Sequence, residues 1–362
     1  MNSEFGRFFL PGPTEVHPDI LAAMVRPMIP HRGPGMVELL AGIEEPLGRI
    51  FRTKRRVLIG TCAATGFMEM AARCGIRARA LSLVGGAFGE RFAAIVRACG
   101  NDVVRVDVQP GQTIEADMVH DALRRSEVDA VTLVHSETST GALAHLAEIA
   151  EVVRGFDDVL VLVDAVTSMA GSPVETDEAA LDFVFTGSQK ALALPPGLAL
   201  AVASERMLER AANVPARGGY LDVLAYDKAI AKRQPTNTPA ISLLYALHAQ
   251  LGRIDAEGGI EARWRRHEKM RQTVERWVDG PGGALGYRFL PPAERRSWTV
   301  SCLRVPSGGN GRVITHAVAQ RGWTIASGYG KLKEATIRIG HMGDHTVERL
   351  EELLSLIEEV SE

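Results

Sequence analysis

The stretch LDFVFTGSQKALALPPG, residues 181–197, places one lysine just beyond a short apolar run. Residues 181–185 are too few and too apolar for a helix and predict a buried strand. Lys190 follows that strand, in the position where open α/β sheets bind their ligands. Most lysines are solvated and need no such surroundings. An amine in this place is a candidate Schiff-base nucleophile if other parts of the chain supply matching groups.

Six further apolar runs accompany this strand along the sequence. They alternate with helical patterns and lie at residues 57–60, 80–84, 103–106, 130–135, 159–165 and 198–204. Continuous leucine and β-branched runs separated by helices are typical of strands buried on both faces. We therefore expect an α/β fold in which a mostly parallel, seven-stranded sheet lies between helices.

The rest of the chain predicts a second, smaller unit. Helical periodicity extends from about Pro239 to Val278, is interrupted at Gly258-Gly259 and stops at the Gly/Pro cluster 280–283. Strands are then predicted at residues 298–305 and 335–340, and helices at residues 314–322 and 345–360. We expect a large domain over residues 19–250 and a small α+β domain over residues 251–362.

Composition excludes several classes of protein. With 362 residues, 46% of them hydrophobic and 23% charged, the chain fits a soluble globular enzyme of two domains. Its net charge of −3 argues against general binding to nucleic acid or to anionic membranes. We expect no signal peptide, because prolines and a glutamate interrupt the N-terminus, and no membrane-spanning helix, because long apolar runs are missing. The basic cluster of Arg263, Arg265, Arg266 and His267 predicts the solvated face of a helix.

The four cysteines form no CxxC pair and have no spacing suited to zinc. We therefore expect reduced thiols, a cytoplasmic location and no metal site.

Asp164 ends the apolar run VLVLVD, where an ionised carboxylate needs a compensating partner. One interpretation is that Asp164 is the N-cap of a following helix. The other is that it pairs with a buried cation. A pyridinium nitrogen fits this second role, because a nearby anion keeps the nitrogen protonated and the ring able to accept electrons.

The segment HSETSTG, residues 135–141, follows another predicted strand. His135 and Glu137 have the chemistry of metal ligands, but the segment offers no third ligand, which makes a metal site a poor interpretation. We favour a hydroxyl-rich turn that presents Thr138 and Ser139 to a ligand.

Three other segments carry candidate binding groups. The loop TCAATG, residues 61–66, joins a strand to a helix, and its small residues suit an anion at the helix N-terminus, although many such turns only cap the helix. Phe88 is either a core aromatic or a stacking face for a flat heterocycle. Arg338 lies between two isoleucines in IRIGHMG; it either points to solvent or binds a carboxylate through both guanidinium nitrogens.

Together these segments resemble the class V aminotransferases of pyridoxal 5′-phosphate (PLP) fold type I, in the alanine–glyoxylate and serine–pyruvate branch. The resemblance covers nearly the whole chain. Its matching phrases are LPGPTEVHP (10–18), AFGERF (87–92), HSETSTG (135–141), VDAVTSMAGSP (163–173), TGSQKALALPPGL (186–198) and RIGHMG (338–343).

The resemblance implies a role for each matched residue. Lys190 forms the Schiff base with PLP and moves the proton of the substrate, and Asp164 holds the pyridine nitrogen protonated. Arg338 binds the substrate α-carboxylate, and residues 1–18 lie near the active site. The remaining cofactor contacts implied are Phe88 and Val166 on the two ring faces, Thr138 near the ring 3-oxygen, and Gln189 with the backbone of Ala64, Thr65 and Gly66 at the phosphate.

The resemblance also implies a homodimer whose active sites lie at the subunit interface. Thr238 matches a threonine that reaches the phosphate in the neighbouring subunit. Two departures affect the phosphate site: Pro235 stands where a phosphate-binding tyrosine is expected, and TCAATG is poorer in glycine and serine than the family pattern. Both predict weaker cofactor binding than is typical.

The activity implied is ping-pong transfer of an amino group from a small amino acid, alanine or serine favoured, to glyoxylate or pyruvate. Alternatives are an aspartate or 2-aminoethylphosphonate aminotransferase and a PLP lyase of the same fold. A cysteine desulfurase needs a mobile nucleophilic cysteine, whereas Cys302 lies within an apolar strand pattern. A non-enzymatic relative would be expected to lack Lys190 or Asp164, and a nucleotide-binding module would need a glycine-rich phosphate loop after the first strand.

Overall fold

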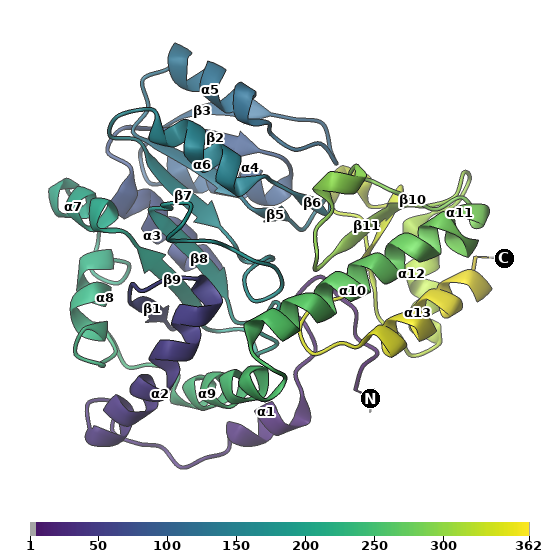
Figure 1. The fold of residues 1–362 in the computed structure, drawn as a ribbon, viewed down its shortest axis with the longest axis horizontal. Helices are drawn as coiled ribbons and strands as arrows, with labels where there is room; N and C mark the ends of the chain where they lie inside the picture. Colours follow the sequence, from purple (N-terminus) through teal and green to yellow (C-terminus); the bar gives the residue numbers. More distant parts are fainter. Residues whose placement is uncertain (1–4, 362) are drawn as a thin grey trace.

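A seven-stranded sheet forms the centre of the larger part of the molecule (Figure 1). The computed structural model describes residues 5–361. Strands β8, β7, β4, β2 and β3 are parallel, whereas β9 is antiparallel to both of its neighbours, β8 and β1. The order across the sheet is β1 (Val57–Gly60), β9 (Ala199–Ala203), β8 (Phe183–Gly187), β7 (Leu160–Asp164), β4 (Ala130–Val134), β2 (Arg79–Val84) and β3 (Asp102–Asp107). The predicted mostly parallel sheet is confirmed.

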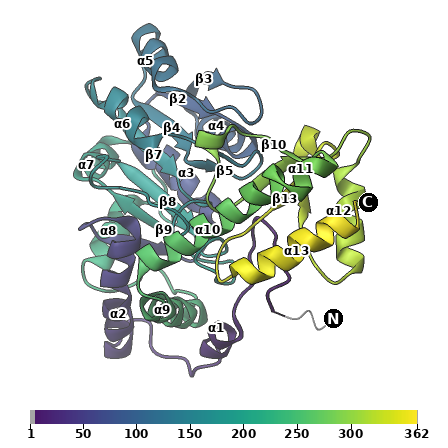
Figure 2. The ribbon, with the colours of Figure 1, turned by 45° about the vertical axis from the view of Figure 1, so that its right-hand side comes forward.

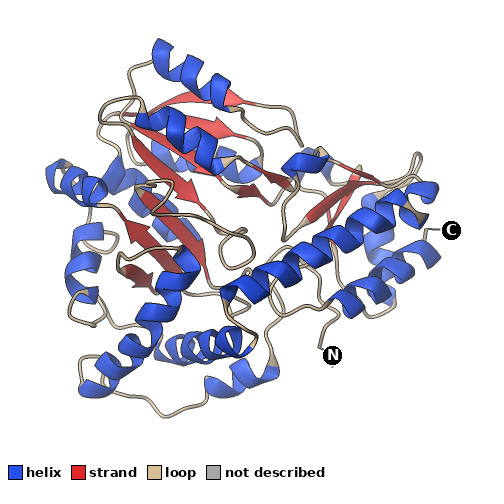
Figure 3. Ribbon diagram, viewed as in Figure 1, coloured by secondary structure: helices blue, strands red, loops and turns tan. Residues whose placement is uncertain are grey.

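Both faces of this sheet are buried under helices, as Figure 3 shows. Successive side chains of a strand point to opposite faces, so Leu162 and Phe185 pack in one apolar layer and Val163 and Val184 in the other. The layer with the two valines contains α2 (Pro34–Phe51), α5 (Ala116–Arg125), α6 (Leu146–Arg154) and α9 (Ile241–Ala256). The opposite layer contains α3 (Ala64–Gly75), α4 (Ala87–Ala98), α7 (Glu205–Asn213) and α8 (Val223–Ile230). This double burial explains the continuous apolar runs of the sequence.

A four-stranded antiparallel sheet with helices forms the smaller part of the molecule. Its strands, in sheet order, are β10 (Arg288–Phe289), β11 (Ser301–Arg304), β13 (Thr336–Ile339) and β12 (Ala326–Ser327). Its helices are α10 (Ile260–Asp279), α11 (Pro281–Leu285), α12 (Gly311–Gln320) and α13 (Val347–Glu359). The remaining elements are α1 (Pro18–Ala23), the hairpin β5 (Ser136–Glu137) and β6 (Ala142–Leu143), and the 3₁₀ turns η1 (Ala293–Arg295) and η2 (Gly330–Leu332).

Helices α9 and α10 connect the two parts, and α10 runs from the large sheet toward the small one (Figure 2). The chain turns between them at Gly258 and Gly259, both of which have positive φ, as a tight turn allows. Helix α9 contacts α1 and α2, whereas α10 contacts α11 and α13. The predicted division of the chain near residue 250 stays a prediction.

The first described residues cross between the two parts. Phe8 forms a parallel bridge with Thr324, and the Phe9 N–H donates to the Thr324 carbonyl at 2.7 Å. A few residues later the Thr14 N–H donates to the carbonyl of Gln189 at 3.0 Å. The segment therefore leads from the small part of the molecule to the turn that carries Lys190.

The basic cluster on α10 is not the solvated face that its charge predicted. Arg263 is 1% exposed and His267 is 0% exposed, whereas Arg265 is exposed. The Arg263 guanidinium donates to Asp344 at 2.8 Å and to the Ala191 carbonyl at 2.7 Å. Positions 263 and 267 lie one helical turn apart, so both point into the junction between the two parts of the molecule. A paired, hydrogen-bonded arginine can be buried there, and local charge does not reveal its partner.

Smaller differences concern element ends. Helix α10 ends at Asp279, one residue beyond the predicted end at Val278, and the Gly/Pro cluster that follows forms the short helix α11, with Pro281 in its first turn, where proline is tolerated. Strand β11 is shorter than the run predicted at residues 298–305. The two-residue strands β5, β6, β10 and β12 were missed because they are too short to show periodicity. Among residues 5–361, no helix is both long and apolar enough to cross a membrane.

Candidate active site

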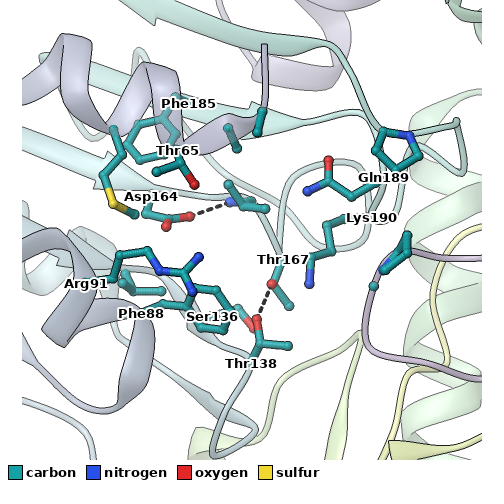
Figure 4. Close-up of a pocket in the computed structure, with 18 residues that line it drawn as sticks. Thr65, Phe88, Arg91, Ser136, Thr138, Asp164, Thr167, Phe185, Gln189 and Lys190 are labelled. Carbon is teal, nitrogen blue, oxygen red and sulfur yellow. Dashed lines mark hydrogen bonds between the residues drawn. The ribbon is translucent and has the colours of Figure 1, made fainter. Parts of the chain in front are cut away.

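Four neighbouring parallel strands bring the main candidates to one edge of the large sheet. In the order β8, β7, β4 and β2, these strands lead into Lys190, Asp164, Thr138 and Phe88. Parallel neighbours place their carboxyl ends at the same edge, which is where α/β proteins bind ligands. Strand β1 has the same direction, because both β1 and β8 are antiparallel to β9, and it leads into α3 at that edge. Loops that are far apart in the sequence therefore lie together around one pocket (Figure 4).

These loops enclose a cavity of about 310 Å³, a volume at the small end of the range for ligand sites. The predicted residues that line it are Ala64, Thr65, Phe88, Thr138, Asp164, Val166, Gln189 and Lys190. Gly66, Thr238 and Arg338 do not line it. Unpredicted lining residues include Gly12, Met68, Arg91, Ser136, Thr167 and Phe185.

The Lys190 side chain is 7% exposed and points into the cavity, as Figure 4 shows. Its ammonium nitrogen donates a hydrogen bond to the Pro11 carbonyl of the N-terminal segment. A Cβ at Gly12 would lie 2.5 Å from Nζ, so only glycine lets the segment pass this close to the lysine. Burial lowers the pKa of Lys190 to about 8, although the nearby Asp164 carboxylate acts in the opposite direction. More of the amine is therefore uncharged and nucleophilic near neutral pH than on a solvated lysine.

Asp164 is 3% exposed and lies at the opposite end of the cavity from Gln189. Its Oδ1 accepts from the Val166 N–H at 2.8 Å, and a turn over residues 166–171, not a helix, comes next. The helix N-cap interpretation is therefore wrong. Burial raises the pKa of Asp164 to about 7, while the Val166 hydrogen bond opposes that change. A cation placed against this carboxyl group is what would keep it ionised.

The N-terminus of α3 offers a site for an anion. Its N-cap, Ala63, provides no side-chain hydrogen bond, and the N–H groups of Ala64 and Thr65 find no acceptor among residues 5–361. Free N–H groups at a helix N-terminus suit a phosphate. The Gly66 N–H instead donates to the Ala63 carbonyl at 2.8 Å, so the structure does not offer it to a ligand. Gln189 completes this end of the cavity.

Some side chains of the loop after β4 line the cavity, and others are buried in the protein interior. Thr138 lines the cavity and its hydroxyl bonds that of Thr167 at 2.5 Å. Ser139, expected to face a ligand, instead accepts from the Ala87 N–H at 3.0 Å and is 3% exposed. His135 is buried with Nδ1 2.9 Å from the Ser168 hydroxyl, and burial lowers its pKa to about 4. Among the described residues, no cluster of three or more His, Cys, Asp and Glu side chains could hold a metal ion.

Arg338 reaches the edge of the site from β13 in the small part of the molecule. It is 9% exposed, and its guanidinium donates to the carbonyls of Thr138 at 3.3 Å and Ser327 at 3.1 Å. Tyr329 lies beside it, with its ring centroid 5.5 Å from the guanidinium carbon of Arg338 and 6.0 Å from the ring centroid of Phe88. The small part of the molecule therefore places a cation and an aromatic ring next to the cavity.

Sequence reasoning missed Gly12, Arg91, Thr167 and Tyr329. Arg91 lines the cavity one helical turn after Phe88, with its guanidinium carbon 4.9 Å from that ring centroid. The i, i+3 spacing from Phe88 is the signal that could have found Arg91. Tyr329 lies beside the site only because the chain folds that way, and no local sequence pattern predicts its position.

The cysteines do not form a nucleophilic site of the desulfurase kind. Cys302 is 0% exposed within β11, and burial raises its pKa to about 11. Burial also raises the pKa of Cys62, beside the α3 turn, to about 11. Both shifts keep the thiols protonated at neutral pH, which opposes nucleophilic attack.

Comparisons with known proteins agree with this geometry. The family model "Aminotransferase class-V" matches residues 91–349. An uncharacterized aminotransferase of Methanocaldococcus jannaschii is 38% identical, the match covering 92% of this chain and 87% of the relative. The chain therefore belongs to the class V aminotransferase family and is a PLP-dependent transaminase with PLP fold type I.

Two solved structures resemble the whole chain. The subgroup IV aspartate aminotransferase of Thermus thermophilus has a TM-score of 0.89 and 33% identity, covering 98% of this chain and 99% of its own. An alanine–glyoxylate aminotransferase of Nostoc sp. has a TM-score of 0.91 and 28% identity, covering 98% of this chain and 95% of its own.

Proposed function

We propose that this chain transfers the amino group of a small amino acid, alanine or serine favoured, to glyoxylate or pyruvate. The observation that carries the proposal is that Lys190 and Asp164 face one cavity, with Arg338 beside it. When bound, PLP supplies an electron-accepting ring conjugated to the substrate Cα. An amine, a carboxylate and a guanidinium are the three groups that this chemistry requires of the protein.

The residues present fit the cofactor. The free N–H groups of Ala64 and Thr65, with Gln189, are proposed to hold its phosphate. Asp164 would hold a proton on the ring nitrogen, and this pairing would keep its own buried carboxylate ionised. Phe88 and Val166 would contact the two faces of the ring, and Thr138 its 3-oxygen.

The chain's own residues would then handle the proton and the substrate. Lys190, once released from the cofactor, would remove the proton from the substrate Cα as a general base. Its hydrogen bond to the Pro11 carbonyl supports this role, because that contact holds the free amine at the cavity. Arg338 would bind the α-carboxylate and so fix the orientation of Cα. The protein would stabilise negative charge at Cα through the proton shared between the ring and Asp164.

The alanine–glyoxylate aminotransferase of Nostoc sp. supports a small donor and glyoxylate as acceptor. Aspartate is the second candidate donor. It is favoured by the aspartate aminotransferase of Thermus thermophilus and by Arg91, which lines the cavity and for which no hydrogen bond or ion pair to residues 5–361 is found. Arg91 would bind the side-chain carboxylate, so Arg91→Gln should lower kcat/KM for aspartate and leave alanine unaffected.

We also propose a homodimer in a reducing, cytoplasmic setting. Thr238 is exposed on the loop before α9, free to reach a neighbouring subunit. The exposed apolar side chains Leu21, Val25 and Met28 support an interface near α1. The four free cysteines support the reducing setting. Sedimentation of the purified protein tests the dimer, and a monomer at micromolar concentration contradicts it.

The test of the transaminase assignment is spectroscopic. Purified protein mixed with PLP should become yellow, and alanine should bleach the colour and release pyruvate. A donor panel of alanine, serine and aspartate against glyoxylate and pyruvate then ranks the substrates. Lys190→Ala should lose the colour and lower turnover by about 10⁴-fold. Protein that stays colourless with PLP contradicts the proposal.

A further inference from the structure

The start of helix α4 carries Phe88, the proposed stacking residue, yet the helix provides no cap of its own. Its N-cap is Gly86, which has no side chain to accept a hydrogen bond. The first N–H groups of any helix lack partners within it, and leaving them unpaired in a partly buried position is costly. Their partners here come from another element.

Those partners are Glu137 and Ser139, about 50 residues further along the chain at β5 and the turn after it. The Glu137 carboxylate accepts from the N–H groups of Phe88 and Gly89, both at 3.1 Å. It also accepts from the Ser139 hydroxyl at 2.5 Å, while that hydroxyl oxygen accepts from the Ala87 N–H at 3.0 Å. Three successive N–H groups of α4 are thus capped from outside the helix.

The chemistry of this contact requires a carboxylate. Glu137 is 4% exposed, and each of its hydrogen-bond partners among the described residues donates to it. An ionised carboxylate only accepts, and hydrogen bonds to it are stronger than neutral ones. Its negative charge also faces the positive end of the helix dipole. Space is tight, because a Cβ at Gly86 would lie 2.6 Å from Cγ of Glu137.

The Phe88 ring depends on this anchor because its own N–H is one of the groups held. The ring faces the cavity, with Lys190 Nζ 5.9 Å from its centroid. On other sides it contacts Arg91 and Tyr329, whose side chains are exposed to solvent. The backbone at the start of α4 is therefore the rigid element that fixes the ring.

We propose that Glu137 is a positioning residue for the reaction: by holding the first turn of α4, it keeps the Phe88 ring where it stacks on the cofactor. The proposal rests on the proposed use of PLP at this cavity. It gives a function to a buried acidic residue that belongs to no group of three or more potential metal ligands among residues 5–361. Glu137 also supports the site electrostatically, because its charge opposes the lowering of the Lys190 pKa.

The test measures the dissociation constant of PLP for four proteins: wild type, Glu137→Gln, Phe88→Leu and the double variant. The glutamine keeps the size of the side chain but turns an NH₂ group toward backbone donors. We expect Glu137→Gln to raise the PLP dissociation constant about tenfold, which corresponds to ~1.4 kcal/mol. In the Phe88→Leu background the same change should have less than about a twofold effect, because Glu137 acts through Phe88. An unchanged constant, or an equal factor in both backgrounds, overturns the proposal.

Asp182→Asn is the matched control. Asp182 is 1% exposed and accepts from the Val161 N–H at 2.9 Å and the Ser204 hydroxyl at 2.7 Å, at the far end of the strands from the cavity. Its replacement should lower the melting temperature and leave the PLP dissociation constant unchanged. If it weakens PLP binding as much as Glu137→Gln does, the effect is general destabilisation and the proposal is wrong.

Two further measurements test the proposal if Glu137→Gln does not fold or if the wild type binds no PLP. Should Glu137→Gln not fold, Ser139→Ala removes the hydroxyl that bonds Glu137 and Ala87, and should raise the PLP dissociation constant about threefold. Should the wild type bind no PLP, the proposed function fails, but hydrogen exchange still tests the anchor. The amides of Phe88 and Gly89 should then exchange faster in Glu137→Gln, and unchanged exchange overturns the anchoring role.

Discussion

The candidate site has two ends, one proposed for the cofactor and one proposed for the substrate, and they are built in different ways. The proposed cofactor end, formed by Asp164, Phe88 and Thr138, consists of residues that end or follow neighbouring strands of one hydrogen-bonded sheet. The proposed substrate end lies beside the cavity; it is formed by Arg338, Tyr329 and the Pro11 carbonyl, and it combines the small part of the molecule with the N-terminal segment. Strand spacing therefore fixes the cofactor end, whereas the substrate end depends on how two parts of the molecule pack.

Lys190 is the residue where the two ends meet. Its pKa is raised by the Asp164 charge and lowered by the Arg338 charge, and its amine bonds Pro11. Among residues 5–361, the two ends also meet through the hydrogen bond from Arg338 to the Thr138 carbonyl and the ring contact of Tyr329 with Phe88. Substitutions at the cofactor end should therefore alter mainly the chemistry of the cofactor. Substitutions at the substrate end should alter mainly the recognition of the substrate.

The largest effect is expected at the cofactor end, from Asp164→Asn. The amide cannot hold a proton on the ring nitrogen through an ionic pair, so kcat should fall about 10²- to 10³-fold, while KM for the amino donor should change little. Steady-state kinetics with alanine and glyoxylate measure this. Asp182→Asn serves as the control for loss of a buried carboxylate. Wild-type kcat in Asp164→Asn would show that the carboxyl group has no role in the chemistry.

At the substrate end, Arg338→Gln removes a charged hydrogen-bond partner of the α-carboxylate. We expect kcat/KM for the amino donor to fall about 10- to 100-fold, since a hydrogen bond to a charged group contributes roughly 1.5–3 kcal/mol. The PLP dissociation constant should not change. Arg304→Gln, on the exposed face of the neighbouring strand β11, is the control and should behave as wild type. Loss of PLP binding in Arg338→Gln would contradict the separation of the two ends.

A smaller effect is expected from Tyr329, whose ring lies between Arg338 and Phe88. Tyr329→Ala should open space for larger donor side chains and raise kcat/KM for leucine relative to alanine about tenfold. Tyr329→Phe keeps the ring and should retain wild-type selectivity. Equal selectivity in all three proteins would show that Tyr329 does not face the substrate.

The smallest effect concerns pH. Only the uncharged Lys190 amine attacks PLP, and burial lowers its pKa to about 8, so attachment of PLP to the apoprotein should speed up as pH rises through about 8 and level off above that pH. Asp164→Asn removes a charge that raises this pKa, so the inflection should move to lower pH. Arg338→Gln removes a charge that lowers it, so the inflection should move to higher pH. Stopped-flow absorbance measures the profile, and shifts of the same sign in both variants would refute the opposing roles.

The order of segments along the chain was enough to predict much of the cofactor end. Most strands of the large sheet are short apolar runs; Asp164 ends one of them and Lys190 closely follows another, so a parallel sheet had to bring the two residues together. The residues that hold the cofactor end in position could not be predicted from the order of segments. Glu137 caps a helix about 50 residues away, and Ser139 does the same, although its hydroxyl was expected to face a ligand. Hydrogen bonds between distant segments leave no periodic signal in the sequence.

The sequence by itself therefore determined the sheet, because strand burial is a local property, and the family, because its motifs are contiguous stretches; it also predicted that Lys190 and Asp164 would face one site, because both lie at strand ends. Only the tertiary structure decided that Arg263 and His267 are buried, that Gly12 lets the N-terminal segment reach Lys190, and that Tyr329 touches Phe88. The hydrogen bonds of the buried Arg263 and His267 side chains to other segments span 72 to 81 residues of the chain, and the contacts of Gly12 and Tyr329 join segments that are still farther apart. Their energies depend on packing and on partners that no local stretch of sequence specifies.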